Sequence, residues 1–175
     1  MADFETALKM VLQHEGGYVD NPNDTPTNYG ITQAVLADYV GHPVTKDEVK
    51  NLSMSMARKI YFERYWKRIQ ADAIETQDVA NHVMDMAVLR GVVAAGKAIQ
   101  TAVGGLKVDG VVGPVTIAAL NRAPAPGFLI SFMKLCVSAF ANIVTADPRK
   151  LEFLRNWCSR ALEMSAAVST LLCGK

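Results

Sequence analysis

The chain has 175 residues, of which half are hydrophobic and 20% are charged, and its formal net charge is +1. This composition is typical of a folded globular protein and excludes intrinsic disorder. A near-neutral total gives no electrostatic basis for binding nucleic acid. The length fits one domain, or two small units that share a core, and it buries enough surface to fold without a metal or disulfide staple.

Neither a membrane span nor a cofactor is expected from the sequence. The longest uncharged stretch near the C-terminus, Leu135 to Ala146, is shorter than the roughly 18 apolar residues that a span needs. Charged side chains occupy the first residues, where a signal peptide has an apolar run. We therefore expect synthesis in the cytoplasm without a signal peptide and no stable membrane insertion. Three cysteines without CxxC spacing, and no cluster with metal-ligand spacing, indicate no disulfide framework and no metal site.

The first segment has the apolar spacing of an amphipathic helix. The residues that share one face are Phe4, Ala7, Leu8, Val11 and Leu12. Asp3 stands at the capping position, and Gly16-Gly17 ends the pattern just after Glu15. Residues 16–32 are rich in Gly, Pro, Asn, Asp and Thr, which predicts turns or a short irregular hairpin.

Helical spacing returns along the rest of the chain. The predicted helices cover residues 33–40, 53–65 and one long segment from Thr76 to Val103 that ends at Gly104-Gly105. Prolines stand where they open further helices, at Pro114, Pro126 and Pro148. No stretch alternates long enough for a substantial sheet. The sequence therefore predicts a mainly α fold with a short irregular β-hairpin.

Carboxylates flank the polar loop that follows the first helix. Glu15 stands at the end of that helix, where the helix dipole disfavours a negative charge, as suits a general acid. A loop that folds back would bring Asp24 or Asp20 opposite Glu15 with water between them. Paired carboxylates across a sugar are the arrangement that glycoside hydrolysis needs. The alternative is that all three are solvated turn residues.

An ordered series of motifs runs through nearly the whole chain. Its parts are Glu15-Gly16-Gly17-Tyr18, Asp24, Thr27-Asn28-Tyr29-Gly30-Ile31-Thr32, Tyr65-Trp66, Met84-Asp85-Met86-Ala87, Val108–Thr116, and finally Trp157 and Arg160. The series resembles the signature of the glycoside hydrolase family 108 muramidases, found among phage endolysins, secretion activators and muramidases that release typhoid-type toxins. The resemblance implies a lysozyme-like helical fold, and its last part looks like the small peptidoglycan-binding module of that family.

The resemblance also implies a reaction and the residues that carry it. The family hydrolyses the β-1,4 bond between N-acetylmuramic acid and N-acetylglucosamine in peptidoglycan. By position, Glu15 matches the general acid, while Asp24 and Thr27 match residues that hold the attacking water. Both an inverting displacement and retention through an Asp nucleophile remain open. The residues that we expect to bind substrate are Tyr18, Asp20, Asn28, Tyr29, His82, Asp85 and Asp109.

Two departures from the family pattern bear on this assignment. Thr25-Pro26 replaces the Gly pair after Asp24 and leaves the loop two residues shorter, and Leu89 replaces an Asn. Pro26 restricts a turn that glycines leave free. The alternative function is therefore a catalytically weak peptidoglycan-binding or secretion-accessory protein.

Charge and organisation suggest how the chain meets its substrate. We expect residues 1–90 to form the muramidase segment and residues 91–175 a helical peptidoglycan-binding segment, packed together as one compact unit. The first 50 residues carry a net charge of −5 and the remainder +6, which suits an anionic wall. We expect a monomer whose partner is peptidoglycan and which reaches the periplasm or cell wall through a holin or another export component.

Overall fold

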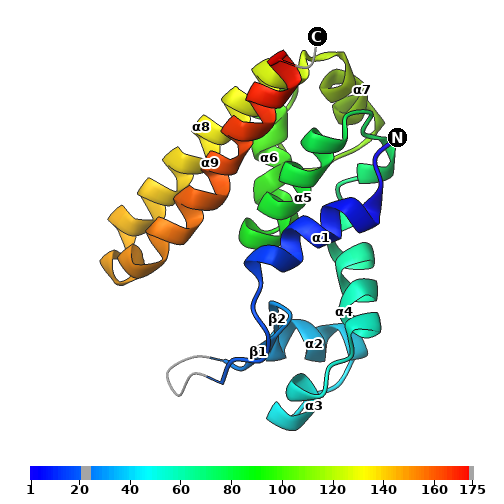
Figure 1. The fold of residues 1–175 in the computed structure, drawn as a ribbon, viewed down its shortest axis with the longest axis vertical. Coiled ribbons are helices and arrows are strands. Elements are labelled where there is room, and N and C mark those ends of the chain that lie inside the picture. Colours follow the sequence, from blue (N-terminus) through cyan, green and yellow to red (C-terminus); the bar gives the residue numbers. More distant parts are fainter. Residues whose placement is uncertain (21–24, 174–175) are drawn as a thin grey trace.

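Helix α5 (Gln77–Arg90) is the central element of the computed structural model, which describes residues 1–20 and 25–173. Every residue of α5 from Val79 to Ala87 is buried, because other helices cover it on several sides. Helix α1 (Phe4–His14) packs along α5, and α6 (Val92–Val103) and α8 (Ala125–Ala146) cover other faces (Figure 1). The mainly α, lysozyme-like fold predicted from the sequence is confirmed.

The remaining elements fall into two groups along the chain. Those before α5 are β1 (Thr27–Asn28), β2 (Ile31–Thr32), α2 (Gln33–Val40), α3 (Lys46–Lys50), α4 (Met54–Tyr61), the π-helical turn η1 (Phe62–Trp66) and the 3-10 turn η2 (Ala71–Ala73). Those after α6 are α7 (Pro114–Arg122), α8, the 3-10 turn η3 (Pro148–Lys150) and α9 (Leu151–Cys173). The predicted helix starts at Pro114, Pro126 and Pro148 each lie at the first turn of such an element.

Helix α1 forms as its sequence predicts. Asp3 caps it, with its Oδ1 accepting a hydrogen bond from the Thr6 backbone N–H at 2.8 Å, which satisfies one of the free donors of the first turn. The predicted apolar stripe faces the core. The helix ends at His14, and Glu15 is the residue that caps it, so the candidate general acid sits where the first helix meets the polar loop.

A small antiparallel hairpin follows α1. Strand β1 pairs with β2, and Val19 forms an additional bridge to Thr27. The turn between the strands consists of Tyr29 and Gly30, whose φ angles are 52° and 71°. Two successive positive φ values match the right-handed twist of the strands, and Asn28-Tyr29-Gly30 supplies residues that fit the tight turn. The short irregular hairpin predicted within residues 16–32 is confirmed for the described part of that range.

The long helix predicted from Thr76 to Val103 is wrong. Gly91, with a φ of 84°, ends α5 and lets the chain turn before α6 begins at Val92. Glycine occupies this left-handed region without steric cost, and the apolar spacing on either side hides the break. The turn directs the N-terminus of α6 toward the part of the molecule that carries the hairpin (Figure 1).

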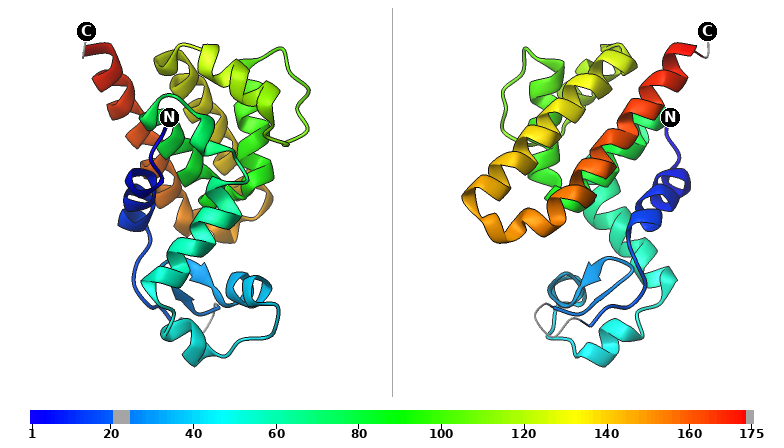
Figure 2. Two further views of the ribbon diagram at one scale, coloured as in Figure 1. Left: turned by 90° about the vertical axis from the view of Figure 1, so that its right-hand side faces the viewer. Right: turned by 60° about the vertical axis from the view of Figure 1, so that its left-hand side comes forward.

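Helices α8 and α9 form a long antiparallel pair that projects from the rest of the molecule (Figures 1 and 2). The buried face of α8 carries Phe128, Phe132, Cys136 and Phe140. By length and composition alone, α8 is long and apolar enough to cross a membrane, with a mean hydropathy of 1.8 over a window that is 28% buried. Lys134 divides this apolar helix, so the uncharged stretch that follows it is shorter than the helix itself.

We expect residues 1–90, made without residues 91–175, to fail to fold cooperatively. The fragment would expose the faces of α5 that α6 and α8 cover, and the buried Asp85 would lose its partner on α9. Circular dichroism during thermal unfolding, compared with the full chain, is the measurement. A sharp, reversible transition in the fragment would show that the two segments are independent domains.

Candidate active site

Glu15 lies beneath the turn of the hairpin. Its side chain is 19% exposed, so its carboxyl group is shielded yet reachable from solvent. A Cβ atom on Gly30 would overlap the Glu15 carboxyl group, Oε2 most closely. Gly30 is therefore required twice, for its positive φ and for this close approach. The hairpin and the end of α1 together define a confined position for one carboxyl group.

Arg160 of α9 joins Glu15 to the centre of the protein. Its Nη1 donates to Glu15 Oε1 at 2.9 Å, while Nη2 and Nε donate to the two oxygens of Asp85 on α5 at 2.5 and 3.2 Å. Asp85 is completely buried, and the Arg160 side chain is 3% exposed. The planar guanidinium matches a carboxylate in two-point contact, so Arg160 is fixed on Asp85 and presents a remaining N–H to Glu15.

The charges of this buried group determine what Glu15 can do. Burial lowers the pKa of Arg160, but the hydrogen bonds and charges of Asp85 and Glu15 outweigh that effect and raise it. Arg160 is therefore always a cation, and Asp85 neutralises it. The sequence indicated only that the helix end disfavours ionised Glu15. The structure adds a charged hydrogen-bond donor, because Arg160 Nη1 donates to Glu15 Oε1.

Two tyrosines hold the turn above Glu15. The Tyr61 side chain is fully buried, and its hydroxyl donates to the Tyr29 carbonyl oxygen at 2.7 Å. Burial, and then the charge of Glu15, raise the pKa of Tyr61, so it remains a neutral donor. The Tyr65 ring lies with its centroid 5.7 Å from that of Tyr61. The backbone geometry of the turn thus depends on a side chain from α4.

The polar loop carries several of the predicted site residues. Thr27 is half-buried in β1 next to Val19. Tyr18 is half-buried with Lys50 Nζ 5.8 Å from its ring centroid. Asp20 is exposed and pairs with Lys46 at 2.9 Å. Asp24, the predicted second carboxylate, lies outside the described residues.

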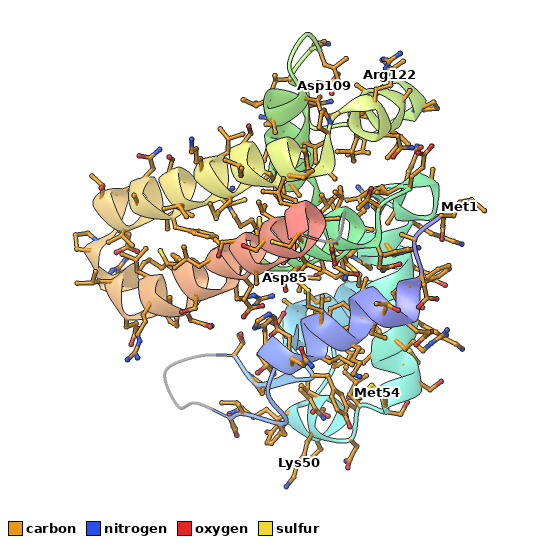
Figure 3. The ribbon with its side chains drawn as sticks, turned by 45° about the horizontal axis from the view of Figure 1, so that its top comes forward. Met1, Lys50, Met54, Asp85, Asp109 and Arg122 are labelled. Atoms are coloured by element: carbon orange, nitrogen blue, oxygen red, sulfur yellow. The ribbon has the colours of Figure 1, made fainter. Side chains whose placement is uncertain are left out.

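Four residues expected to bind substrate take positions that the sequence did not indicate. Asn28 is buried and donates to the carbonyl oxygens of Val49 and Lys50, so its amide anchors the hairpin to α3. Asp85 and His82 are buried in α5 and do not line an open surface. Asp109 accepts hydrogen bonds from Gln100 and Val111 in a turn distant from Asp85 (Figure 3).

Arg160 closes the series of residues in which the chain resembles the family, but it was given no role in the site. One feature of the sequence could have indicated its burial: Arg160 lies on the apolar stripe of α9, with Ala161, Met164 and Val168. A charged residue on a buried face needs a partner, but its partners lie 75 and 145 residues away. A second contact joins α1 to α9, since His14 Nε2 lies 3.0 Å from Glu163 Oε2. Both segments of the chain therefore build the site.

Comparisons with known proteins agree with this geometry. The model of the glycosyl hydrolase 108 family matches residues 8–91. The solved structure of Brucella abortus SagA superposes with a TM-score of 0.83 and 31% sequence identity, covering 96% of this chain and 94% of that one. No curated protein sequence matches the chain.

The family model and the solved structure assign the chain to one class of enzyme, the glycoside hydrolases. The chain belongs to the glycosyl hydrolase 108 family. The family is the one that its motifs resemble, and membership in it supports a peptidoglycan hydrolase.

Removing Arg160 tests the buried charge group. We expect Arg160→Met to lower the free energy of unfolding by about 3–5 kcal/mol, because it leaves Asp85 as an uncompensated buried charge. The double variant Asp85→Leu/Arg160→Met removes both charges and should recover most of that loss. Urea unfolding followed by tryptophan fluorescence measures both. Equal destabilisation in the single and double variants would contradict the pairing.

A pH effect on stability follows from His82. Its Nδ1 has no hydrogen-bond partner among the described residues, and burial lowers its pKa. The unfolded chain therefore binds a proton that the folded chain excludes, so stability falls as pH drops through about 6.5, by up to about 1.4 kcal/mol per pH unit. We expect His82→Gln to flatten this dependence in urea unfolding between pH 7.5 and 5.5. The exposed His42→Gln is the control and should leave the slope unchanged.

Proposed function

We propose that this glycoside hydrolase is an N-acetylmuramidase that cleaves the β-1,4 bond between N-acetylmuramic acid and N-acetylglucosamine. The observation that carries the proposal is the single shielded carboxyl group of Glu15, held between the hairpin turn and the guanidinium of Arg160. A general acid needs a position that fixes one oxygen and leaves the other to the substrate. Peptidoglycan is the substrate of the family that the motifs resemble.

The hydrogen bond from Arg160 distinguishes the two oxygens of Glu15. Oε1 accepts from Arg160, so the transferable proton resides on Oε2, which faces Gly30. As Oε2 gives its proton to the glycosidic oxygen, negative charge develops on the carboxylate, and the Arg160 N–H is already in place to stabilise it. Asp85 balances the charge of Arg160, so the guanidinium meets Glu15 as part of a neutral pair.

Water attack completes the proposed reaction. Asp24 and Thr27 would orient the attacking water on the face of the sugar opposite Glu15, which gives inversion at the anomeric carbon. A covalent intermediate on an Asp would give retention. NMR spectroscopy of the first anomer released from a soluble glycan oligomer decides between these outcomes.

Substrate contacts and access to the wall complete the proposal. Tyr18 and Tyr29 are partly exposed on the polar loop and would stack on sugar rings. Residues 91–175, with the turn around Asp109, would add wall affinity through their net positive charge. A holin or other export component would bring the protein to the periplasm or wall, where it would act in lysis or in release of phage or toxin.

Substitution of Glu15 tests the catalytic assignment. We expect Glu15→Gln to lower the rate of reducing-end release from purified peptidoglycan by about 10²–10⁴-fold, the usual cost of losing a general acid. The fold should remain, since the amide oxygen still accepts from Arg160. Glu152→Gln, at an exposed position of α9, is the matched control and should keep full activity.

The outcomes separate the muramidase from its rival. Full activity in a folded Glu15→Gln protein would end the assignment of the acid. Wall binding by the unaltered protein without new reducing ends would support the catalytically weak binding or secretion-accessory protein. Asp24→Asn should also be severely impaired, and a larger loss in Asp20→Asn would move the second carboxylate to Asp20.

A further inference from the structure

A cavity of about 310 Å³ lies between α2, the end of η1 and the junction of α5 with α6. Its lining contains three arginines and no acidic residue. The lining residues that matter here are Arg64, Tyr65, Arg68, Arg90, Val92 and Val93. A concave site with three cations and no carboxylate is electrostatically suited to an anion.

The arginines differ in how far their charge is already compensated. Arg64 forms an ion pair with Asp38 and lies over the Tyr39 ring. Arg68 is exposed and makes no ion pair or hydrogen bond with any described residue. Arg90 is half-buried over the Phe140 ring, at 5.6 Å from its centroid, and has no carboxylate partner among residues 1–20 and 25–173. The cavity thus keeps a net positive charge.

Backbone donors add to this charge. Gly91 has no side chain to cap α6, and no described group accepts from the N–H groups of Val92, Val93 and Ala94, since the first bond of the helix runs from Ala95 N–H to the Gly91 carbonyl oxygen. The apolar side chains of Val92 and Val93 and the Tyr65 ring form the other part of the lining. An aliphatic group that ends in a carboxylate would satisfy both parts of the cavity, whereas a bare inorganic anion would leave the apolar part unused.

A series of contacts connects the cavity to the Glu15 carboxyl group. Tyr65 lines the cavity, and its ring packs on that of Tyr61. Tyr61 in turn holds the carbonyl oxygen of Tyr29, the residue before Gly30 at the Glu15 carboxyl group. A glycan at Glu15 would therefore place its side branches within reach of the arginines.

We propose that this cavity binds a free carboxylate of the stem peptides that branch from the glycan, and so fixes the substrate beside Glu15. The inference rests on the proposed muramidase function. It implies that recognition of the peptide begins within the segment that carries Glu15 and does not depend on the turn around Asp109 alone. Arg68 would form the principal charge-assisted contact, because it has no competing partner.

The test compares two preparations of one peptidoglycan. In both, the free amines of the stems are acetylated; in one, the stem carboxylates are then converted to neutral amides with a carbodiimide and excess ethanolamine. We expect the KM for reducing-end release to rise about tenfold on the amidated wall, with kcat within twofold. Arg68→Gln should show that higher KM on both walls, and Arg68→Lys should restore part of the preference.

Arg122→Gln is the control for general charge loss. Arg122 is exposed on α7, distant from Asp85 (Figure 3), and its loss removes the same charge. It should retain the preference for free carboxylates. If Arg122→Gln and Arg68→Gln reduce the preference equally, a diffuse surface potential explains it and the cavity has no specific role.

The remaining outcomes separate this inference from the proposed function. If the unaltered protein cleaves both walls with the same KM, the carboxylate site is overturned while the muramidase stands. If it cleaves neither, the muramidase itself fails. Inorganic phosphate is the second probe: competition by millimolar phosphate that Arg68→Gln abolishes, with no effect of amidation, would assign the cavity to a phosphate group and overturn the carboxylate assignment.

Discussion

The buried contact of Asp85, Arg160 and Glu15 is the constraint on which the site depends. Taking two charges out of water costs several kcal/mol per ion, and only close, well-oriented partners offset that cost. The two-point contact between Arg160 and the fully buried Asp85 provides such geometry. It also fixes how α9 lies against α5, so that α9 delivers one N–H to Glu15 and no other cation to the site.

The hairpin turn is the second constraint on Glu15, and it acts through backbone conformation and not through charge. Tyr29 and Gly30 both adopt positive φ, a conformation that costs energy at Tyr29 and needs compensation. The buried hydroxyl of Tyr61 supplies it by bonding the Tyr29 carbonyl oxygen, and Asn28 anchors the adjacent strand to α3. The carboxyl group of Glu15 is therefore held between one electrostatic and one backbone constraint.

The sequence reveals the local features of this protein well. The Asp3 cap, the apolar stripe of α1 and a short irregular hairpin within residues 16–32 are each set by residues a few positions apart, and they were predicted. The break at Gly91 was not predicted, because the residues on both sides of it have helical spacing and nothing in that spacing indicates a turn. The side-chain positions of Asn28, His82 and Asp85 were missed, since burial is decided by packing partners far along the chain.

Arg160 shows that the candidate site extends beyond the residues matched by the family model. The family model ends at residue 91. The donor to Glu15, however, is Arg160 on α9, which is 145 residues from Glu15 in the sequence. The series of motifs ends on Arg160, but a resemblance in sequence does not say that its guanidinium reaches Glu15, because that contact depends on how distant helices pack. Since Arg160 of α9 contacts both Asp85 on α5 and Glu15, the C-terminal helices shape the candidate site whether or not they also bind the wall.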